Sequence, residues 1–390
     1  MTPVKPAAAR PLDRRPLSIL HVIETLGQGG AEQALVNLLP TLVERGHRVG
    51  VVALQAPGTL AGALEAGGVA VHQLGLPHRW ALPQAVRALR SVASDGVDVV
   101  HSHLYFADVY TGMVRAAGGP PCVSTFHNLE QGERYPRASW KQIRRGLHGL
   151  LLRRVFGARL AVSDVVGQHY RDALVLPDVT VVPNAVPTEK AATSDEQAAS
   201  LRASLSIPDG HAMVLLPGRA VPEKGHRVLF EAAGRLAERG IEPVFVCAGG
   251  GPLEAGLARG VAARGLESQV RLLGAVPHTD LQSLMRVADV VVVPSLREGF
   301  GLVVAEAYVQ ERPVVASAVG GIPSLVRDGE SGLLVPPGDA GALADAIARI
   351  LLDPSFGERL ASVGRDQVVA TMSAETVATE LMSVYESVLA

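Results

Sequence analysis

The sequence contains few cysteines, and both lie in apolar runs. Cys122 and Cys247 are the only two among 390 residues. Two isolated thiols of this kind do not fit a disulfide framework or a cysteine-rich zinc site, and they indicate a reducing compartment. Long apolar runs are also missing, because no stretch reaches the ~18 consecutive apolar residues that a membrane-spanning helix requires.

The amino-terminal stretch has no apolar segment of the kind found in secretory signals. Residues 1–16 contain four prolines and several arginines. We expect a disordered tail there, since a signal peptide needs an apolar central region. The sequence therefore predicts a cytoplasmic protein, and it leaves open a peripheral attachment to the inner face of the membrane.

Aromatic residues and net charge are both low. The chain is 48% hydrophobic but only 4% aromatic, and its formal net charge is −2. A nearly neutral chain has no electrostatic bias towards nucleic acid, so we expect no such partner. A composition rich in Ala, Val, Leu and Gly favours α/β layers over an all-β fold, and the length suits two domains of roughly 150–200 residues each.

From residue 17 onward, apolar runs of strand length alternate with segments of helical period. This alternation predicts parallel sheets with helices on both faces, because each crossover must pass over the sheet. The predicted strands are residues 17–23, 49–54, 97–101, 121–125, 160–163, 179–182, 212–216, 243–247, 270–273, 290–293, 313–316 and 332–335. The predicted helices include residues 83–94, 105–117, 134–159, 225–240, 302–310 and 374–389.

The alternation stops near residue 185 and restarts at 212. We therefore predict an α/β protein of two Rossmann-like, doubly wound parallel-sheet domains that face a cleft, which is the default binding site of such folds. The predicted parts are a disordered tail (1–16), a first domain (17–185), a linker with a weak helix at most (186–209), a second domain (210–372) and a final helix (373–390).

Residues 294–306 carry the strongest functional signal. They follow the apolar run 290–293, contain Gly299 and Gly301, and enter a predicted helix. A strand, a glycine turn and a helix N-terminus can hold an anion, because free backbone N–H groups point outward there. Glu298 and Glu306 bracket this turn. Carboxylates would repel phosphate, so they suit the hydroxyls of groups attached to the phosphates, such as ribose and a sugar.

A basic pair follows the first predicted strand of the second domain. Arg219 and Lys224 stand five residues apart. The planar fork of arginine and the point charge of lysine together suit a diphosphate, although a solvated loop would explain the pair equally well if it stood alone. The glycine loops at 27–30 and 249–251 do not fit the dinucleotide fingerprint, which disfavours a dehydrogenase.

Three histidines follow two neighbouring strands of the first domain. His101 and His103 come after one strand, and His127 comes after the next. Metal binding by His101 and His103 is one interpretation, but no acidic or cysteine partner stands at a suitable spacing. We expect no metal site, and we expect a polar contact to substrate instead, with His127 as the preferred residue.

As a set, these residues resemble the retaining glycosyltransferases of the GT-B fold, the large group that includes bacterial glycogen synthases, sucrose synthases and polysaccharide-building mannosyltransferases. The resemblance covers nearly the whole chain. Its most specific motifs are the Arg–Lys loop and the two glutamates with seven residues between them. The matching segments are 29–32, 126–128, 161–163, 182–184, 218–225 and 298–306. The last helix resembles the family's tail that crosses back onto the first domain, whereas Ala220 replaces a residue that is commonly larger.

The resemblance implies a role for each matching residue. The first domain would bind the acceptor and the second the nucleotide sugar. The implied catalytic residues are His127, Arg219, Lys224 and Glu298. The implied donor-binding residues are Gly29 and Gly30 over the phosphates, Arg219 and Lys224 on the diphosphate, Leu273 and Gly274 beside the base, Glu298, Gly299, Phe300, Gly301 and Leu302 at the sugar and its phosphate, and Glu306 on the ribose.

The implied reaction moves a sugar from a nucleotide diphosphate to an acceptor hydroxyl with retention of configuration. It needs neither metal nor cofactor, because Arg219, Lys224 and the helix dipole at Leu302 can stabilise the leaving diphosphate. A double displacement would need a carboxylate nucleophile, and no acid of the first domain suits that role, so a front-face route is favoured.

The substrates are less specified. We prefer UDP over GDP or ADP, and a saccharide, a lipid-linked molecule or a small molecule as acceptor, in the synthesis of polysaccharide, glycolipid or a related glycoconjugate. Two alternatives stay open, a sugar-nucleotide epimerase of similar fold and a non-catalytic sugar-nucleotide sensor.

The predicted helix at 134–159 contains eight basic residues and no acid. Apolar residues recur in it at helical spacing, at Trp140, Ile143, Leu147, Leu151 and Val155. A basic amphipathic helix can lie on an anionic membrane. The alternative is that this apolar stripe faces the core of the first domain and that the basic residues are solvated.

Overall fold

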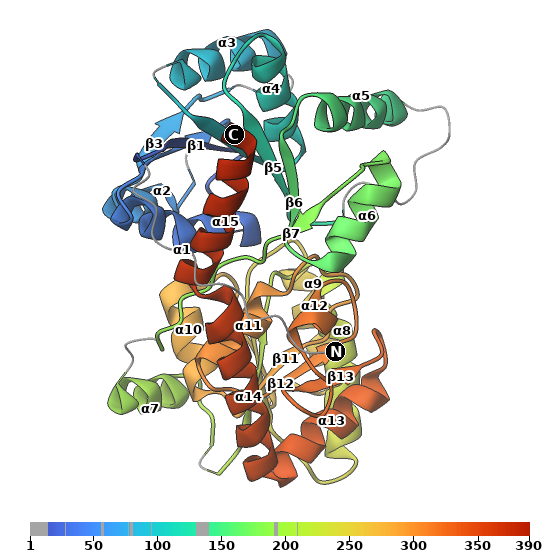
Figure 1. Cartoon of the computed structure of the whole chain (residues 1–390). Coiled ribbons are helices and arrows are strands. Elements are labelled where there is room, and N and C mark those ends of the chain that lie inside the picture. The colour runs from blue at the N-terminus through green and yellow to red at the C-terminus, as the bar shows by residue number, and fades with distance from the viewer. Residues whose placement is uncertain are drawn as a thin grey trace, which may run out of the picture.

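The computed structural model describes residues 15–27, 29–55, 58–76, 78, 81–94, 96–129, 140–190, 194–208 and 210–390. These residues form two parallel sheets, one above the other in Figure 1, with helices packed against both. The predicted fold class, two doubly wound α/β domains, is confirmed.

The first sheet has seven parallel strands in the order β3-β2-β1-β4-β5-β6-β7. Its central strands are buried along nearly their whole length, as expected for strands covered on both faces. The strands are β1 (Ser18–Ile23), β2 (Arg48–Ala53), β3 (Ala70–Gln73), β4 (Val99–His103), β5 (Cys122–Phe126), β6 (Ala158–Ala161) and β7 (Thr180–Val181). The helices are α1 (Gly30–Glu44), α2 (Ala61–Ala66), α3 (Leu82–Ala93), α4 (Tyr105–Ala116), α5 (Trp140–Arg154) and α6 (Asp164–Leu174).

The second sheet has six parallel strands in the order β10-β9-β8-β11-β12-β13. The strands are β8 (Met213–Pro217), β9 (Val244–Ala248), β10 (Val270–Leu272), β11 (Val290–Val293), β12 (Val314–Ser317) and β13 (Leu333–Val335). The helices of this half are α7 (Asp195–Ser204), the 3₁₀ turn η1 (Pro222–Lys224), α8 (His226–Ala237), α9 (Glu254–Ala262), α10 (His278–Val287), α11 (Leu302–Val309), α12 (Ile322–Leu325) and α13 (Ala340–Leu352), followed by α14 (Pro354–Met372) and α15 (Ala374–Leu389).

The structure corrects several predicted elements. Strand β3 was not predicted, because it is an edge strand whose residues are mostly exposed and give no apolar run. Helices α2 and α6 were also missed. The segment expected to contain a weak helix at most forms the ten-residue helix α7, where Ser194 and Gln197 make a capping box. The helix predicted at 134–159 ends at Arg154, since β6 already begins at Ala158; residues 134–139 lie outside the described residues.

The last two helices connect the halves of the molecule. Helix α14 packs along α11 in the second half, and α15 packs against α1 in the first (Figure 1). The chain passes between the halves at two points, near Val186 and near Met372. These two points lie side by side, since the Val186 N–H donates to Met372 O at 3.0 Å. Arg45 holds the start of α15 through hydrogen bonds to Glu375 and Thr379. The domain boundaries given above stay a prediction.

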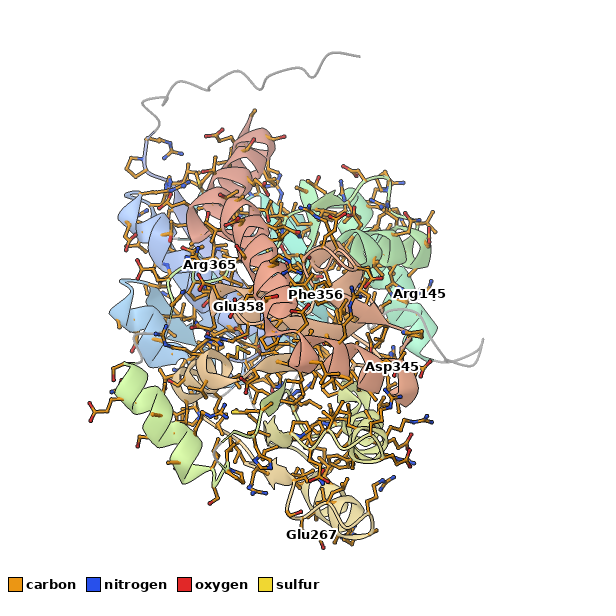
Figure 2. All side chains as sticks on the ribbon, turned by 90° about the horizontal axis from the view of Figure 1, so that it is seen from below. Arg145, Glu267, Asp345, Phe356, Glu358 and Arg365 are labelled. Carbon is orange, nitrogen blue, oxygen red and sulfur yellow. The ribbon has the colours of Figure 1, made fainter. Side chains whose placement is uncertain are left out.

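Helix α14 is fixed to the second half by aromatic and ionic contacts. Phe356, labelled in Figure 2, lies under the guanidinium groups of Arg349 and Arg359, whose carbons are 4.1 and 5.7 Å from the ring centre. Arg365, also labelled there, pairs with Glu311 at 3.5 Å. These contacts position the junction from which α15 departs.

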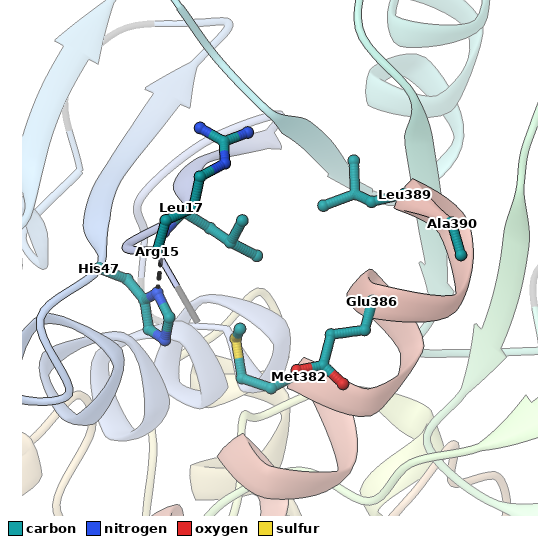
Figure 3. A pocket seen from close by; sticks show the side chains of 7 residues that line it. All are labelled: Arg15, Leu17, His47, Met382, Glu386, Leu389 and Ala390. Carbon is teal, nitrogen blue, oxygen red and sulfur yellow. Dashed lines mark hydrogen bonds between the residues drawn. The ribbon is translucent and has the colours of Figure 1, made fainter. Parts of the chain in front are cut away.

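A pocket of about 420 Å³ lies where the start of the first sheet meets the end of α15 (Figure 3). The Leu17 N–H donates to His47 Nδ1 at 3.2 Å beside it. The lining residues are Arg15, Leu17, His47, Met382, Glu386, Leu389 and Ala390. None of them belongs to the site predicted from the sequence.

Helix α5 has an unusual surface. Ile143 is 66% exposed, and Leu147 and Leu150 are each 48% exposed, whereas Leu151 and Leu152 are buried. The predicted apolar stripe is therefore divided between solvent and core. Within the described residues, no helix is both long and apolar enough to cross a membrane.

Candidate active site

The glycine turn after β11 is built by close backbone approaches. Gly301 has φ +94° and caps α11, a conformation that L side chains rarely adopt. The turn also packs on a second glycine loop. A Cβ on Gly320, which has φ +58°, would lie 1.7 Å from Glu298 O, and the Gly321 N–H donates to Gly299 O at 3.1 Å. The N-terminus of α11 is therefore held in a fixed place.

Lys224 and Glu298 come together as an ion pair. The Lys224 Nζ lies 2.6 Å from Glu298 Oε2, and their side chains are 20% and 14% exposed. Ser295 Oγ donates to the same carboxylate oxygen at 3.3 Å. Two predicted site segments, 74 residues apart in the chain, thus meet at the carboxyl ends of the adjacent strands β8 and β11.

Backbone contacts fix the Lys224 loop against the Glu298 loop. The Leu296 N–H donates to Glu223 O at 2.7 Å. Gly225 has φ +71°, and a Cβ there would lie 1.8 Å from Pro294 O. Only glycine fits this position, because both the dihedral angle and the space exclude a side chain.

Glu306 is a buried acid inside α11. It is 3% exposed, and burial raises its pKa to about 7. His278 Nε2 lies 3.8 Å from Glu306 Oε1, and burial lowers the pKa of that histidine. Near pH 7 Glu306 is therefore only partly ionised beside an uncharged His278, and a ligand that donates hydrogen bonds to Glu306 would stabilise its ionised form.

Arg219 lies close to an acid of the opposite half. Burial raises the pKa of Glu32, and the positive charge of Arg219 opposes this shift. Thr25 Oγ1 donates to Glu32 Oε1 at 3.1 Å, and a Cβ on Gly29 would lie 2.2 Å from Glu32 Oε2. The loop around Gly29 and Gly30 therefore lies on the side of the first half that faces Arg219.

The remaining predicted residues lie at loop positions near this turn or beside β10. Leu273 and Gly274 directly follow β10, and the Gly249 N–H donates to Gly274 O at 2.8 Å. The Phe300 side chain is buried in the core, so only the main chain of this residue can contact a ligand. Leu302 is the first residue of α11.

His127 brings the first half against the glycine turn. A Cβ on Gly299 would lie 2.4 Å from His127 O, and Ser163 Oγ donates to Gly299 O at 3.3 Å. The His127 ring Nε2 is 3.0 Å from His103 Nδ1. Burial lowers the pKa of His127 to about 4, so its ring is neutral near pH 7.

Sequence reasoning missed His21, which completes a histidine cluster. Its Nδ1 lies 3.0 Å from His103 Nε2, and β1 is in register with β4 so that His21 stands opposite His101. His21, His101 and His103 each offer a ring nitrogen within 4.8 Å of the others. A signal was available, because a histidine in the middle of an apolar strand needs a buried polar partner.

Two family models cover most of the chain. The model described as glycosyl transferases group 1 matches residues 197–367, and the one described as glycosyltransferase family 4 matches residues 28–190. Together they cover the second sheet and every strand of the first except β1. The chain belongs to the GT-B glycosyltransferases.

Relatives and structures agree with this assignment. The chain is similar to an alpha-D-kanosaminyltransferase of Streptomyces kanamyceticus, 35% identical over 51% of this chain and 51% of that one. It is also similar to a D-inositol 3-phosphate glycosyltransferase of Mycobacterium tuberculosis, 33% identical over 72% of this chain and 58% of that one. The chain therefore spans little more than half the length of these curated relatives.

The fold matches solved GT-B structures over nearly its whole length. The structure of Anabaena HepE with UDP and glucose superposes with a TM-score of 0.83 at 23% identity, covering 95% of this chain and 100% of that one. The sucrose-phosphate synthase of Thermosynechococcus elongatus superposes with a TM-score of 0.79 at 23% identity, covering 95% and 98%. At this identity the likeness establishes the fold.

Proposed function

We propose that this protein is a retaining glycosyltransferase that moves a sugar from a nucleotide diphosphate to an acceptor hydroxyl. The observation that carries the proposal is the Lys224–Glu298 pair at the N-terminus of α11. A cation, a carboxylate and free helix N–H groups converge there. These are the groups needed to hold a diphosphate and the hydroxyls of the attached sugar.

In the proposed donor site, each of these groups contacts a different part of the nucleotide sugar. Lys224 and Arg219 bind the diphosphate together with the N–H groups at 299–302. The Glu306 carboxylate accepts hydrogen bonds from the ribose hydroxyls, and the main chain at Leu273 and Gly274 borders the base. Glu298 and His127 hold the transferred sugar, while Gly29 and Gly30 close over the phosphates from the opposite half.

The ion pair gives the site a way to respond to its donor. Without donor, Glu298 neutralises Lys224 at 2.6 Å. A bound diphosphate attracts Lys224 more strongly than one carboxylate does, since it carries more negative charge. Glu298 is then released to accept hydrogen bonds from the sugar. Binding of the diphosphate and orientation of the sugar are therefore coupled through one salt bridge.

In the proposed reaction the bond between the anomeric carbon and the phosphate oxygen breaks, and the acceptor oxygen bonds to that carbon on the same face. The acceptor's proton passes to the departing phosphate oxygen. Arg219, Lys224 and the α11 dipole stabilise the charge that develops on the diphosphate, so we propose that transfer is independent of metal and of cofactor.

We propose UDP as the nucleotide, with GDP second. Similar structures in complex with UDP and with UDP-glucose support this order. The acceptor class is a hydroxyl of a saccharide, a lipid-linked molecule or a small molecule. One similar protein is named a D-inositol 3-phosphate glycosyltransferase, and that name supports a small polar acceptor.

The Lys224→Ala substitution tests the proposal. We expect turnover to fall by at least ~10²-fold, because one charge that stabilises the leaving group is lost. Lys190→Ala is the matched control, since it removes the lysine of an exposed ion pair with Glu311 on another surface. Near-normal transfer by Lys224→Ala would exclude the assigned role. Product formation from donor alone, with a changed sugar configuration, would indicate an epimerase, and binding without turnover would indicate a sensor.

We also propose that α5 contacts an anionic membrane surface. Three exposed apolar side chains, Ile143, Leu147 and Leu150, stand on a helix that contains five basic residues. Each basic residue near such a surface adds about 1 kcal/mol of attraction. Co-sedimentation with vesicles containing anionic lipid should weaken in Ile143→Asn with Leu147→Asn. It should not weaken in Leu352→Asn, which alters a leucine elsewhere that is more exposed than either of these residues. No binding of the wild type would exclude the contact.

A further inference from the structure

The interior of the first half contains a line of hydrogen-bonded side chains that ends at His127. His127 Nε2 lies 3.0 Å from His103 Nδ1, and His103 Nε2 lies 3.0 Å from His21 Nδ1. His21 Nε2 in turn lies 3.5 Å from the Tyr385 hydroxyl of α15. Tyr385 also contacts His101. We call this series of side chains, in the order His127, His103, His21, Tyr385 and His101, the histidine chain.

The far end of the histidine chain is His101. Its Nδ1 lies 2.7 Å from the Tyr385 hydroxyl, and its Nε2 lies 2.7 Å from Thr125 Oγ1. Burial lowers the pKa of His101 well below its usual value and raises that of Tyr385 well above its own. The rings are therefore neutral and the phenol is protonated. Each neutral ring has one N–H donor and one bare nitrogen that accepts.

This arrangement does not suit a metal ion. The His101 and His103 rings are stacked with centres 4.4 Å apart, whereas the His21 and His103 rings meet edge to edge through the 3.0 Å contact between their nitrogens. Ring nitrogens bind a metal along directions in the ring plane, so the stacked rings of His101 and His103 direct their lone pairs side by side instead of towards one ion at about 2.0–2.1 Å. In the described part of the chain, all nitrogens of these three rings already have hydrogen-bond partners.

The direction of the chain follows from Tyr385. Both hydroxyls approach His101 at 2.7 Å, but a neutral ring can accept from only one of them. The phenol of Tyr385 is far more acidic than the Thr125 hydroxyl and is the better donor. Its alternative acceptor, His21, is 3.5 Å away, so a bond to it would be longer and weaker than the one to His101. Tyr385 therefore donates to His101, and His101 donates to Thr125.

The same direction then continues to His127. Because Tyr385 uses its proton on His101, its oxygen presents only lone pairs to His21, so the 3.5 Å contact favours a proton on His21 Nε2 and leaves His21 Nδ1 as an acceptor. His103 donates to that atom from Nε2, so His103 Nδ1 accepts from His127 Nε2–H. The result is that His127 carries its proton on Nε2 and has a bare Nδ1. That Nδ1 is buried and has no partner among the described residues.

We propose that Tyr385, His21 and His103 are positioning residues that fix the tautomer of His127, so that His127 Nδ1 accepts a hydrogen bond from a hydroxyl of the donor sugar. This inference rests on the proposed function for the identity of the ligand. An unpartnered buried nitrogen is unfavourable, and a sugar hydroxyl would satisfy it. A carboxylate at the same place would be repelled by the lone pair, so the chain selects a sugar that presents a hydroxyl there.

The arrangement also gives α15 a part in donor selection. Tyr385 is fully buried and belongs to the helix that reaches the first half from the end of α14. The residue that sets the direction of the chain is therefore 258 residues from His127 in sequence. The Tyr385 phenol therefore links the packing of α15 on the first half to the tautomer of His127 in the donor site.

Tautomers can be measured directly with histidine labelled with ¹⁵N. Long-range ¹⁵N–¹H correlation spectra distinguish the Nε2–H from the Nδ1–H form of each neutral ring. We expect the Nε2–H form for His127, His103 and His21 in the wild type. This measurement requires no substitution, so it tests the direction even if a variant fails to fold. Nδ1–H at His127 would overturn the proposal.

Tyr385→Phe removes the hydroxyl that sets the direction. We expect both tautomers at His127, and the dissociation constant of UDP-glucose should rise about two- to tenfold, because only the competent fraction of the protein binds. The dissociation constant of UDP, which lacks the sugar, should not change. Tyr110→Phe is the control, since Tyr110 is a buried tyrosine of the same half outside the chain. A purely structural role for Tyr385 would lower stability but leave the ratio of the two constants unchanged, and that result would overturn the proposal.

Two further outcomes separate the possible failures. Binding of neither UDP nor UDP-glucose by the wild type would refute the proposed donor, and the spectra would then decide the tautomer assignment alone. Stoichiometric binding of Zn²⁺ with simultaneous shifts of the His21, His101 and His103 signals would identify a metal site and overturn the inference.

Discussion

The contact between Gly299 and the backbone of His127 gives the sharpest test of how the two halves cooperate. A Cβ added at Gly299 would lie 2.4 Å from His127 O and 3.2 Å from the Asn128 Cα. Cβ atoms essentially never approach a heavy atom closer than 3.0 Å, so Gly299→Ala must separate these backbones by about 0.6 Å or more. Neither side can yield cheaply, because both atoms belong to the main chain.

The expected result is a large loss of transfer with little loss of stability. A misplacement of about 1 Å can cost ~10²-fold in rate, so we expect kcat/KM to fall roughly 10- to 100-fold, or about 1.4–2.7 kcal/mol of transition-state stabilisation. The affinity for UDP should change much less, because the proposed phosphate and ribose contacts come mainly from the second half. The Tm should stay near that of the wild type, since each sheet keeps its own core.

The matched control is Gly256→Ala. Gly256 lies in α9, and a Cβ there meets nothing within 4 Å. It should raise stability by up to ~1 kcal/mol through helix propensity and leave transfer unchanged. Transfer by Gly299→Ala within twofold of the wild type would refute the idea that this contact sets how the two halves are placed for transfer. A large drop in its Tm would instead show that Gly299 is needed to fold the second half.

The other predictions concern single groups. Burial raises the pKa of Glu306 to about 7, so UDP affinity measured by calorimetry should strengthen as the pH rises through 7, where the carboxylate gains its second acceptor oxygen; Glu306→Gln should abolish this dependence. Because the unfolded side chain ionises near 4.5, the free energy of unfolding contributed by Glu306 should fall from pH 4.5 to 7 and then level off, unlike that of the glutamine variant. Gly225→Ala should destabilise the protein in urea by more than Gly240→Ala, because both have φ +71° but only Gly225 faces a backbone oxygen at 1.8 Å. Ser194→Ala should cost about 1 kcal/mol in the same assay by removing the cap of α7, and no change would exclude that role for the capping box.

The Lys224 and Glu298 loops could be predicted from the sequence because their signals are local. Lys224 and Glu298 each follow an apolar run that reads as a buried strand, and each is next to a glycine that marks a turn. Strands of one parallel sheet end at the same edge, so the two loops were expected near one another. The direct salt bridge between them was not expected, since it depends on β8 and β11 being neighbours, which the order along the chain does not reveal.

The histidine cluster shows where this reasoning stops. His101, His103 and His127 were predicted to follow strands, but the structure places His101 inside β4, as it places His21 inside β1, and Tyr385 lies on the last helix. Their contact depends on strand register and on where α15 packs. Strand β3 was missed for a different reason, because exposed edge strands give no apolar run, and α7 was underestimated although its capping box is a recognisable sequence signal.

The return of α15 to the first half has a consequence for the order of folding. Val377, Leu381 and Tyr385 are buried in the core around β1 and α1, yet the ribosome makes them about 200 residues after that half is otherwise complete. During synthesis this apolar surface and the histidines of the first half therefore remain uncovered. They stay so while the second half is made and folds. The part of the protein that is made first is the part that is finished last, and substitutions of Val377 or Leu381 should act on chaperone dependence and yield before they act on catalysis.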